Sequence, residues 1–330
     1  MVKYIIKRLL LSVLILFSVS VILYALARNM NMDAVWAKVS GALNSGQNAE
    51  EMYNKIMKEL GFEDNSFWGI IKGYFSWLGN FLRGNMGTSI KYNQPVEDVI
   101  SKNMGISFTI SLVSLVLQLI IAIPLGIKCA VNQYGKLDYA ATFLTMIGIS
   151  FPTFFAASLA IKFFSVDLGW FPVSGIQSGS LVSPTWWEGF KDKVWHMTLP
   201  IIVLVVLSIG SWSRYTRTNT LEVLNADYIR TARAKGLSER SVVYKHVFRN
   251  SLIPLVTVLA GTLPTLFGGA MITETMFSIP GIGKLAYDAM IAGDVLFIMG
   301  YNMFLAVLTI VGILLTDIMY AVVDPRVKLA

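Results

Sequence analysis

Charged residues are scarce in this chain of 330 residues, and cysteine is almost missing. Only 14% of the residues are charged and 55% are hydrophobic, whereas a soluble domain has about 25% charged residues. This balance excludes an ordinary soluble globular protein and predicts one that crosses a membrane several times. Cys129 is the single cysteine, which excludes an intramolecular disulfide and a cysteine metal cluster. The two histidines, His196 and His246, stand too far apart in sequence to form a helical metal pair.

The short motifs of several enzyme classes are missing as well. The sequence contains no Walker motif, no zinc-metalloprotease motif and no serine nucleophile elbow. A membrane enzyme is therefore disfavoured, because no nucleophile or metal constellation is available to it. We expect a non-catalytic chain with no cofactor and no metal, which cannot hydrolyse ATP itself.

Ionisable residues are rare inside the apolar runs. Lys162, Glu274 and Asp317 lie at the ends of such runs, where interfacial snorkelling or helix capping is the favoured interpretation. An ion-coupled carrier usually has ionisable residues buried in the middle of its spans. Transport against a gradient would therefore draw its energy from a partner protein.

Six apolar runs are long enough to cross a bilayer core, which requires about 20 residues in a helix. They predict an all-α polytopic membrane protein with six transmembrane helices. The predicted spans are Leu9–Ala27, Met104–Ile127, Tyr139–Ile161, Met197–Ser213, Asn250–Thr273 and Val295–Thr316.

Three of these runs carry features that bear on their interpretation. The first ends in Ala25-Leu26-Ala27, which mimics a signal-peptide cleavage site, although its apolar stretch is long for a signal peptide. In the third run, Pro152 predicts a kink, either beside a cavity or for packing alone. The fifth run is interrupted by Pro254, Pro264 and Gly268-Gly269, which favours a place at the centre of the bundle.

The distribution of charge predicts that both termini are cytoplasmic. With six spans arranged in this way, the inner side holds 15 of the 27 basic residues and 6 of the 20 acidic ones. Basic residues accumulate on the cytoplasmic side of membrane proteins, so this asymmetry supports the arrangement. It also accounts for the formal charge of +7 without a nucleic-acid partner.

The largest inner loop, residues 214–250, is basic and has signals of local structure. It carries eight basic and three acidic residues. Asn225 is expected to cap a helix with Asp227 in its first turn, and Gly236 is expected to end that helix in the left-handed conformation. Ser238 can then cap a second helix. One face of that second helix would hold Val242, Val243 and Val247.

The same segment carries a family resemblance. The stretch Asp227-Tyr-Ile-Arg-Thr-Ala-Arg-Ala-Lys-Gly-Leu-Ser238, followed by His246, Arg249-Asn250 and Pro254, resembles the coupling loop of the membrane subunits of ABC importers. It is most similar to the oligopeptide/dipeptide permease subfamily. The general importer motif begins Glu-Ala-Ala, whereas this chain has Arg230-Thr231-Ala232 and lacks the leading Glu, as the peptide-permease branch permits.

Other stretches resemble the same subfamily. They are Gly84–Ser89 followed by Pro95-Val96, Leu168–Gly175, Glu274–Gly283 and the ending Asp324–Lys328. The resemblance covers about residues 84–328. It implies a type I ABC importer permease with a cytoplasmic coupling helix and a sizeable extracytoplasmic segment after the first helix.

The resemblance further implies a set of partners. Two cytoplasmic ABC ATPase subunits would dock on Asp227, Tyr228, Ala232, Arg233, Ala234, Lys235, Gly236, Leu237 and Ser238. A second, homologous permease subunit would complete a heterodimeric membrane core, and an extracytoplasmic substrate-binding protein would deliver a peptide. The chain would then lie in the cell membrane, with lipid around it.

The corresponding division has four parts. Residues 1–30 form an N-terminal transmembrane helix, 31–103 an extracytoplasmic segment, 104–323 the permease core with its coupling loop at 214–250, and 324–330 a cytoplasmic tail. Two alternatives remain: a secondary carrier or channel whose basic loop only reflects topology, and an ABC permease for nickel chelates or another non-peptide solute.

Overall fold

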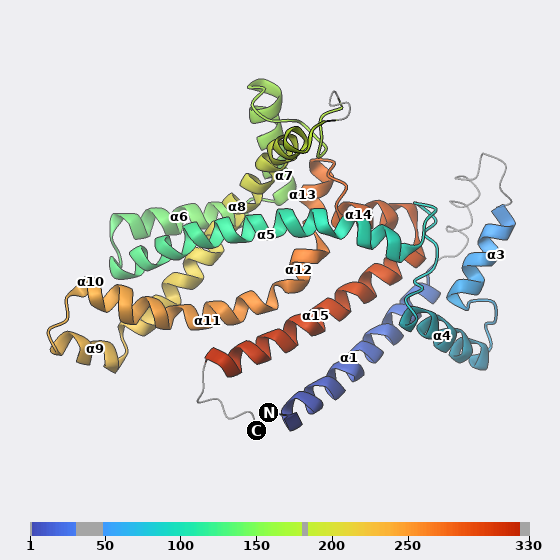
Figure 1. Ribbon diagram of the computed structural model, residues 1–330, viewed down its shortest axis with the longest axis horizontal. Helices are drawn as coiled ribbons and strands as arrows, with labels where there is room; N and C mark the ends of the chain where they lie inside the picture. Colours follow the sequence, from blue (N-terminus) through green and yellow to red (C-terminus); the bar gives the residue numbers. More distant parts are fainter. Residues whose placement is uncertain (1, 31–48, 180–183, 324–330) are drawn as a thin grey trace.

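The computed structural model describes residues 2–30, 49–179 and 184–323, and within these ranges the regular elements are all helices (Figure 1). Residues 31–48 of the expected extracytoplasmic segment and the expected tail 324–330 lie outside the described residues. The α-helices are α1 (Val2–Arg28), α3 (Ala49–Leu60), α4 (Phe67–Leu82), α5 (Val96–Val131), α6 (Lys136–Ser150), α7 (Thr153–Ala160), α8 (Trp186–Leu224), α9 (Asp227–Ala234), α10 (Glu239–Ser241), α11 (Phe248–Gly261), α12 (Leu263–Gly268), α13 (Met271–Met276), α14 (Ile282–Ala292) and α15 (Val295–Val323). Two π-helices, Ile161–Asp167 and Val242–Val247, continue α7 and α10.

Among the described residues, four helices are long and apolar enough to cross a membrane alone, and the number rises to six if each of two bent pairs counts as one span. The four are α1, α5, α8 and α15. This agrees with the six spans expected from sequence, although α5 and α8, at 36 and 39 residues, extend well beyond the predicted runs.

The third predicted span is broken rather than kinked. Its two halves, Lys136–Ser150 and Thr153–Asp167, meet at an angle of 99°. Pro152 disfavours the helical conformation of the residue before it, and Phe151 is accordingly extended, with φ −80° and ψ 121°. The fifth span bends by 51° between Leu259 and Leu263.

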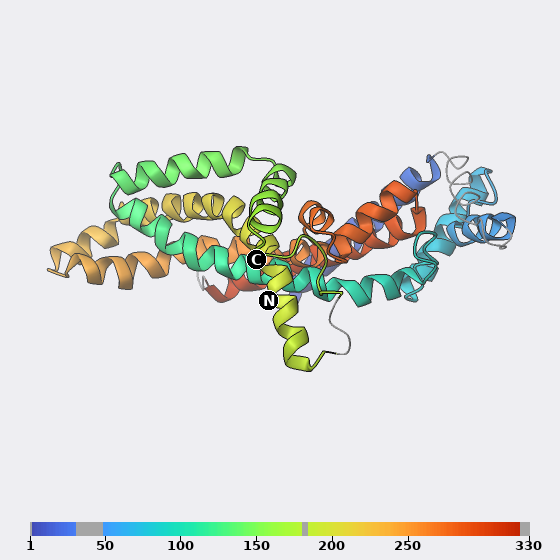
Figure 2. The same ribbon diagram turned by 90° about the horizontal axis from the view of Figure 1, so that it is seen from above.

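Helices α5 and α8 pack against each other at the centre of the molecule (Figures 1 and 2). Helix α6 packs against α8. The backbones approach closely at two glycines. A Cβ atom on Gly126 of α5 would lie 2.6 Å from the carbonyl oxygen of Ser213 of α8, and one on Gly210 of α8 would lie 2.8 Å from Thr145 of α6. Small residues allow such contacts between helices in a membrane, where apolar surface alone gives no preference for protein over lipid.

Helices α3 and α4 share a buried apolar cluster with α1 and α15. Tyr24 of α1, Leu60 of α3, Trp77 of α4 and Phe297 of α15 belong to one buried apolar cluster. Trp77 fills this cluster and is only 4% exposed. Trp68 is 76% exposed, as an interfacial anchor would be.

Two acidic residues at span ends take part in specific contacts. Glu274 is fully buried, and its carboxylate accepts hydrogen bonds from the backbone N–H groups of Ala270 and Lys284, at 3.1 and 3.0 Å. It therefore caps the first turn of α14, which is one of the two roles expected for it. Asp317 forms an ion pair with Arg8 at 3.0 Å, so the beginning of α1 and the end of α15 lie together.

Candidate coupling site

The segment that carries the family motif lies at one end of the molecule. Figure 1 shows α9 and α10 at the left end and α3 and α4 at the right end, and Figure 2 shows the same separation from above. The segment follows α8 directly and continues into α11. Any force applied to it therefore acts on two helices of the bundle.

The first helix of the segment is α9, and its beginning differs from the expectation. Asn225 does not cap α9: it is the C-terminal capping residue of α8, and its N–H donates to the carbonyl oxygens of Leu221 and Glu222. The residue before α9 is Ala226, which offers no side-chain hydrogen bond. Asp227 does lie in the first turn of α9, where its charge is favourable to the helix dipole.

The turn after α9 is formed as predicted. Gly236 has a φ of +78°, and its N–H donates to the carbonyl oxygen of Arg233 at 2.9 Å. Ser238 caps the next helix by accepting a hydrogen bond from the N–H of Ser241. An ion pair of 2.7 Å between Arg233 and Glu239 joins the two helices across the turn.

One face of this helix–turn–helix is buried against the end of α8. Ile229, Ala232, Val242 and Val247 form a small apolar cluster, with Val223 and Leu224 of α8 packed against it. Val243 is also buried, so the three valines predicted to share a face do so. The cluster fixes the segment to α8 and leaves its other face exposed.

The predicted docking residues divide between these two faces. Ala232 is buried in the apolar cluster and serves packing. The exposed residues are Asp227, Tyr228, Arg233, Ala234, Lys235, Gly236, Leu237 and Ser238. Partial burial raises the pKa of the Tyr228 hydroxyl, and the nearby charge of Glu222 raises it further.

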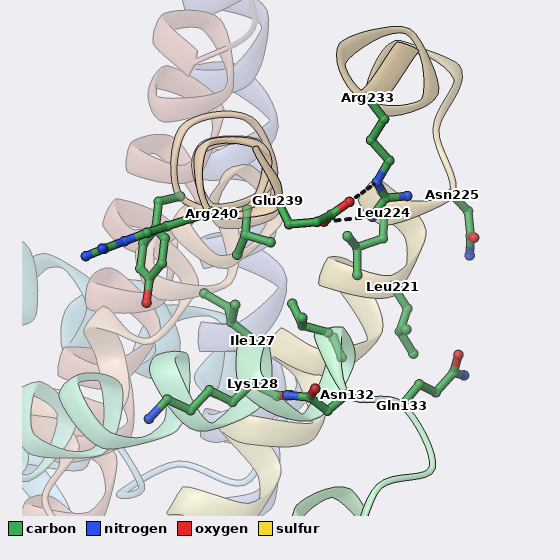
Figure 3. Close-up of a pocket in the computed structure, with 14 residues that line it drawn as sticks. Ile127, Lys128, Asn132, Gln133, Leu221, Leu224, Asn225, Arg233, Glu239 and Arg240 are labelled. Atoms are coloured by element: carbon green, nitrogen blue, oxygen red, sulfur yellow. Dashed lines mark hydrogen bonds and ion pairs between the residues drawn. The ribbon is translucent and has the colours of Figure 1, made fainter. Parts of the chain in front are cut away.

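A cavity of about 670 Å³ lies between this segment and the C-terminal end of α5 (Figure 3). Lys128, Asn132 and Gln133 line it from one side, and the ion pair of Arg233 and Glu239 lines it from the other. The sequence did not indicate that Lys128, Asn132 and Gln133 face this segment, because about 100 positions separate them from Arg233 and no local pattern connects the two stretches.

A buried ion pair ties α8 to the beginning of α6 close to this segment. The guanidinium group of Arg217 donates to both carboxylate oxygens of Asp138, at 2.6 and 2.8 Å. The backbone N–H of Tyr134 donates to the same carboxylate at 2.9 Å. The side chain of Asp138 is 5% exposed and that of Arg217 is 24% exposed. The sequence indicated only that both residues face the inner side.

Comparison with known proteins decides the family. The family model for the binding-protein-dependent transport system inner membrane component matches residues 122–329. The chain belongs to this permease family. It is similar over 329 residues, at 36% identity, to the oligopeptide transport system permease protein AppB of Bacillus subtilis, covering 99% of this chain and 100% of AppB. It is 35% identical over 330 residues to the dipeptide transport system permease protein DppB of Lactococcus lactis, covering all of both chains.

Family membership confirms several predictions. The chain is an integral membrane permease component and not the catalytic part of a transport system. The stretch 227–238, the cavity and the Asp138–Arg217 pair all lie within the matched range.

Proposed function

We propose that this chain forms half of a peptide pathway in an ATP-driven importer, and that residues 225–250 couple it to cytoplasmic ATPase subunits. The observation that carries the proposal is the helix–turn–helix itself, which has a buried apolar face on α8 and an exposed polar face. Membership of the permease family and the similarity to an oligopeptide and a dipeptide permease support the transport of peptides.

The proposed mechanism is mechanical. Two ATPase subunits close when they bind ATP and shift the exposed face of α9 and the turn at Gly236. Because the opposite face is fixed to Val223 and Leu224, the shift passes to the end of α8. The Asp138–Arg217 pair then passes it to α6. The bundle changes from an inward-open to an outward-open state, in which a binding protein can deliver a peptide.

The proposed docking residues are the nine named from sequence, with two roles. Ala232 keeps α9 seated on the apolar cluster. The other eight present the surface that the ATPase contacts, and Lys235 lies beside the glycine turn at the exposed end of α9. In this proposal both termini are cytoplasmic, and residues 31–103 face the outside together with the loops around 168–175 and 274–294.

The partners complete the proposed assembly. A second, homologous permease subunit provides the other half of the pathway, and an extracytoplasmic substrate-binding protein supplies the peptide. The four-part division at residues 30, 103 and 323 belongs to the same proposal. Arg8 and Asp317 hold the beginning of α1 and the end of α15 together, which supports placing both ends of the chain on one side of the membrane.

Site-directed cross-linking tests this assignment. Lys235→Cys in a Cys129→Ser background is expected to form a disulfide with a cysteine introduced in the cleft of the ATPase subunit of the purified transporter. Lys72→Cys is the matched control, because Lys72 is an exposed lysine on α4 at the opposite end of the molecule. A cross-link from position 72 but not from position 235, or labelling of position 235 from outside intact cells, would contradict the proposal.

A further inference from the structure

A second cavity, of about 310 Å³, opens between helices of the bundle, and its lining mixes apolar residues with hydroxyl and amide groups. It is bounded by α5, α8 and the broken segment of α11 to α13. Its lining residues are Ser111, Ser114, Leu115, Gln118, Leu204, Ser208, Trp212, Thr262, Thr265, Leu266, Gly269 and Ala270. None of them carries a charge, and the volume is at the small end of the roughly 300–1,000 Å³ of ligand pockets.

The polar residues of the lining form stripes along two helices. On α5, Ser111, Ser114 and Gln118 follow the spacing of one helical face. Ser208 and Trp212 do the same on α8. Ser114 lies at the middle of the 36-residue α5 and within the predicted span Met104–Ile127, so the cavity adjoins an apolar stretch. Hydroxyl and amide groups are costly there unless they are paired.

One of these groups has no partner. The Ser114 side chain is only 2% exposed, and its hydroxyl oxygen has no hydrogen-bond partner among the described residues. Unpaired buried polar atoms are uncommon in proteins, and each needs an explanation. A ligand in the cavity would supply the missing partner.

The other side of the cavity is irregular backbone. Thr262 stands between α11 and α12, and Gly269, with φ +78°, stands between α12 and α13. Backbone that is not helical is tolerated at membrane depth only where protein buries it or where it lines a cavity. Interrupted helices of this kind form the substrate sites of many secondary transporters near the middle of the membrane.

The hydroxyl groups of the lining offer both kinds of partner that a peptide group needs. Thr262 and Thr265 donate their protons to the carbonyl oxygens of Leu259 and Thr262, at 2.7 and 2.6 Å, so their oxygens keep only the capacity to accept a hydrogen bond. The Ser114 hydroxyl can donate. An amide group has one N–H donor and one C=O acceptor, whereas the charged ends of a peptide would find no charged partner in this lining.

We infer that this cavity is a subsite for the uncharged backbone of an extended peptide in transit, with Ser114 as a donor to a peptide carbonyl oxygen. The inference rests on the proposed function and names where the substrate is held. It differs from a pathway without specific contacts, because it assigns a hydrogen bond to one side chain.

Uptake by the assembled transporter in proteoliposomes tests the inference, with radiolabelled penta-alanine as the probe. Ser114→Ala is expected to raise the KM for penta-alanine about fivefold, the factor that corresponds to one neutral hydrogen bond. Thr109→Val is the matched control, because Thr109 is an exposed hydroxyl residue on α5 outside the cavity lining. It is expected to transport like the unmodified protein.

A labelling experiment gives a readout independent of transport. In a Cys129→Ser background, saturating penta-alanine should slow the reaction of N-ethylmaleimide with Ser114→Cys and should not affect Ile120→Cys, which is 63% exposed on another face of α5. If the unmodified protein imports penta-alanine while Ser114→Ala keeps its KM and position 114 is not protected, only the inference is overturned. If the unmodified protein imports no peptide, the proposed function fails and the inference fails with it.

Discussion

Asp138→Ala is expected to destabilise the protein by about 3 kcal/mol and to remove most ATP-driven uptake. The change leaves the guanidinium group of Arg217 without its carboxylate, and breaking a buried ion pair on one side costs roughly 3–5 kcal/mol. We expect the lower end of that range because the Arg217 side chain keeps 24% of its exposure and water can reach it. A fall in the melting temperature of the purified transporter measures the first effect, and proteoliposome uptake measures the second.

Two variants separate stability from coupling. Replacing both partners, in Asp138→Ala with Arg217→Met, removes the unpaired charge and should recover much of the lost stability. If the pair transmits movement from α8 to α6, uptake should stay low in this double variant. Lys102→Ala breaks an exposed ion pair with Asp98, and we expect a change below about 1 kcal/mol. An Asp138→Ala protein as stable as Lys102→Ala would show that the buried pair contributes little.

Gly236→Val is expected to abolish coupling while leaving the bundle folded. Residues other than glycine are strained at a φ of +78°, at a cost of about 1–3 kcal/mol. No heavy atom lies within 4 Å of a Cβ built at this position, so the cost comes from the backbone and not from a clash within the chain. If the turn relaxes to relieve about 2 kcal/mol of strain, the docked population falls roughly 30-fold. Co-purification of the ATPase and uptake both report this change.

Gly236→Asn is the matched variant for this turn. Asparagine enters the left-handed region more readily than valine, so the turn should persist and uptake should stay near that of the unmodified protein. Equal loss in both variants would mean that the ATPase approaches the glycine too closely for any side chain. Full activity of the valine variant would mean that the turn has no part in coupling.

The expectations from sequence succeeded where the controlling signal is local. Gly236 and Ser238 each act on the few residues around them, and both formed the turn and cap that were predicted. The prediction that Asn225 caps α9 was wrong. Helix α8 continues to Leu224, and the Asn225 N–H caps the C-terminal end of that helix instead. At Pro152 the sequence predicted a change of direction but not its size of 99°, which depends on what the second half packs against.

The candidate site was predictable only in part, for the same reason. The motif at 227–238 was found because its residues are contiguous. The Asp138–Arg217 pair joins residues 79 positions apart, and the sequence showed only two charges on the same side. The unpaired hydroxyl of Ser114 is likewise a property of three helices together, since a serine in an apolar run reads in sequence as an ordinary small residue.

The right-angled break at Pro152 has a consequence for the surrounding lipid. At 1.5 Å per residue, the 15 residues of α6 reach only about 22 Å, whereas the hydrocarbon core of a bilayer is about 30 Å thick. The second half of that span turns by 99° and adds little reach in the direction of α6. If α6 stands along the bilayer normal, the bilayer beside it would have to thin locally or be replaced by protein, so hydrophobic mismatch would favour placing the proposed second permease subunit at this edge.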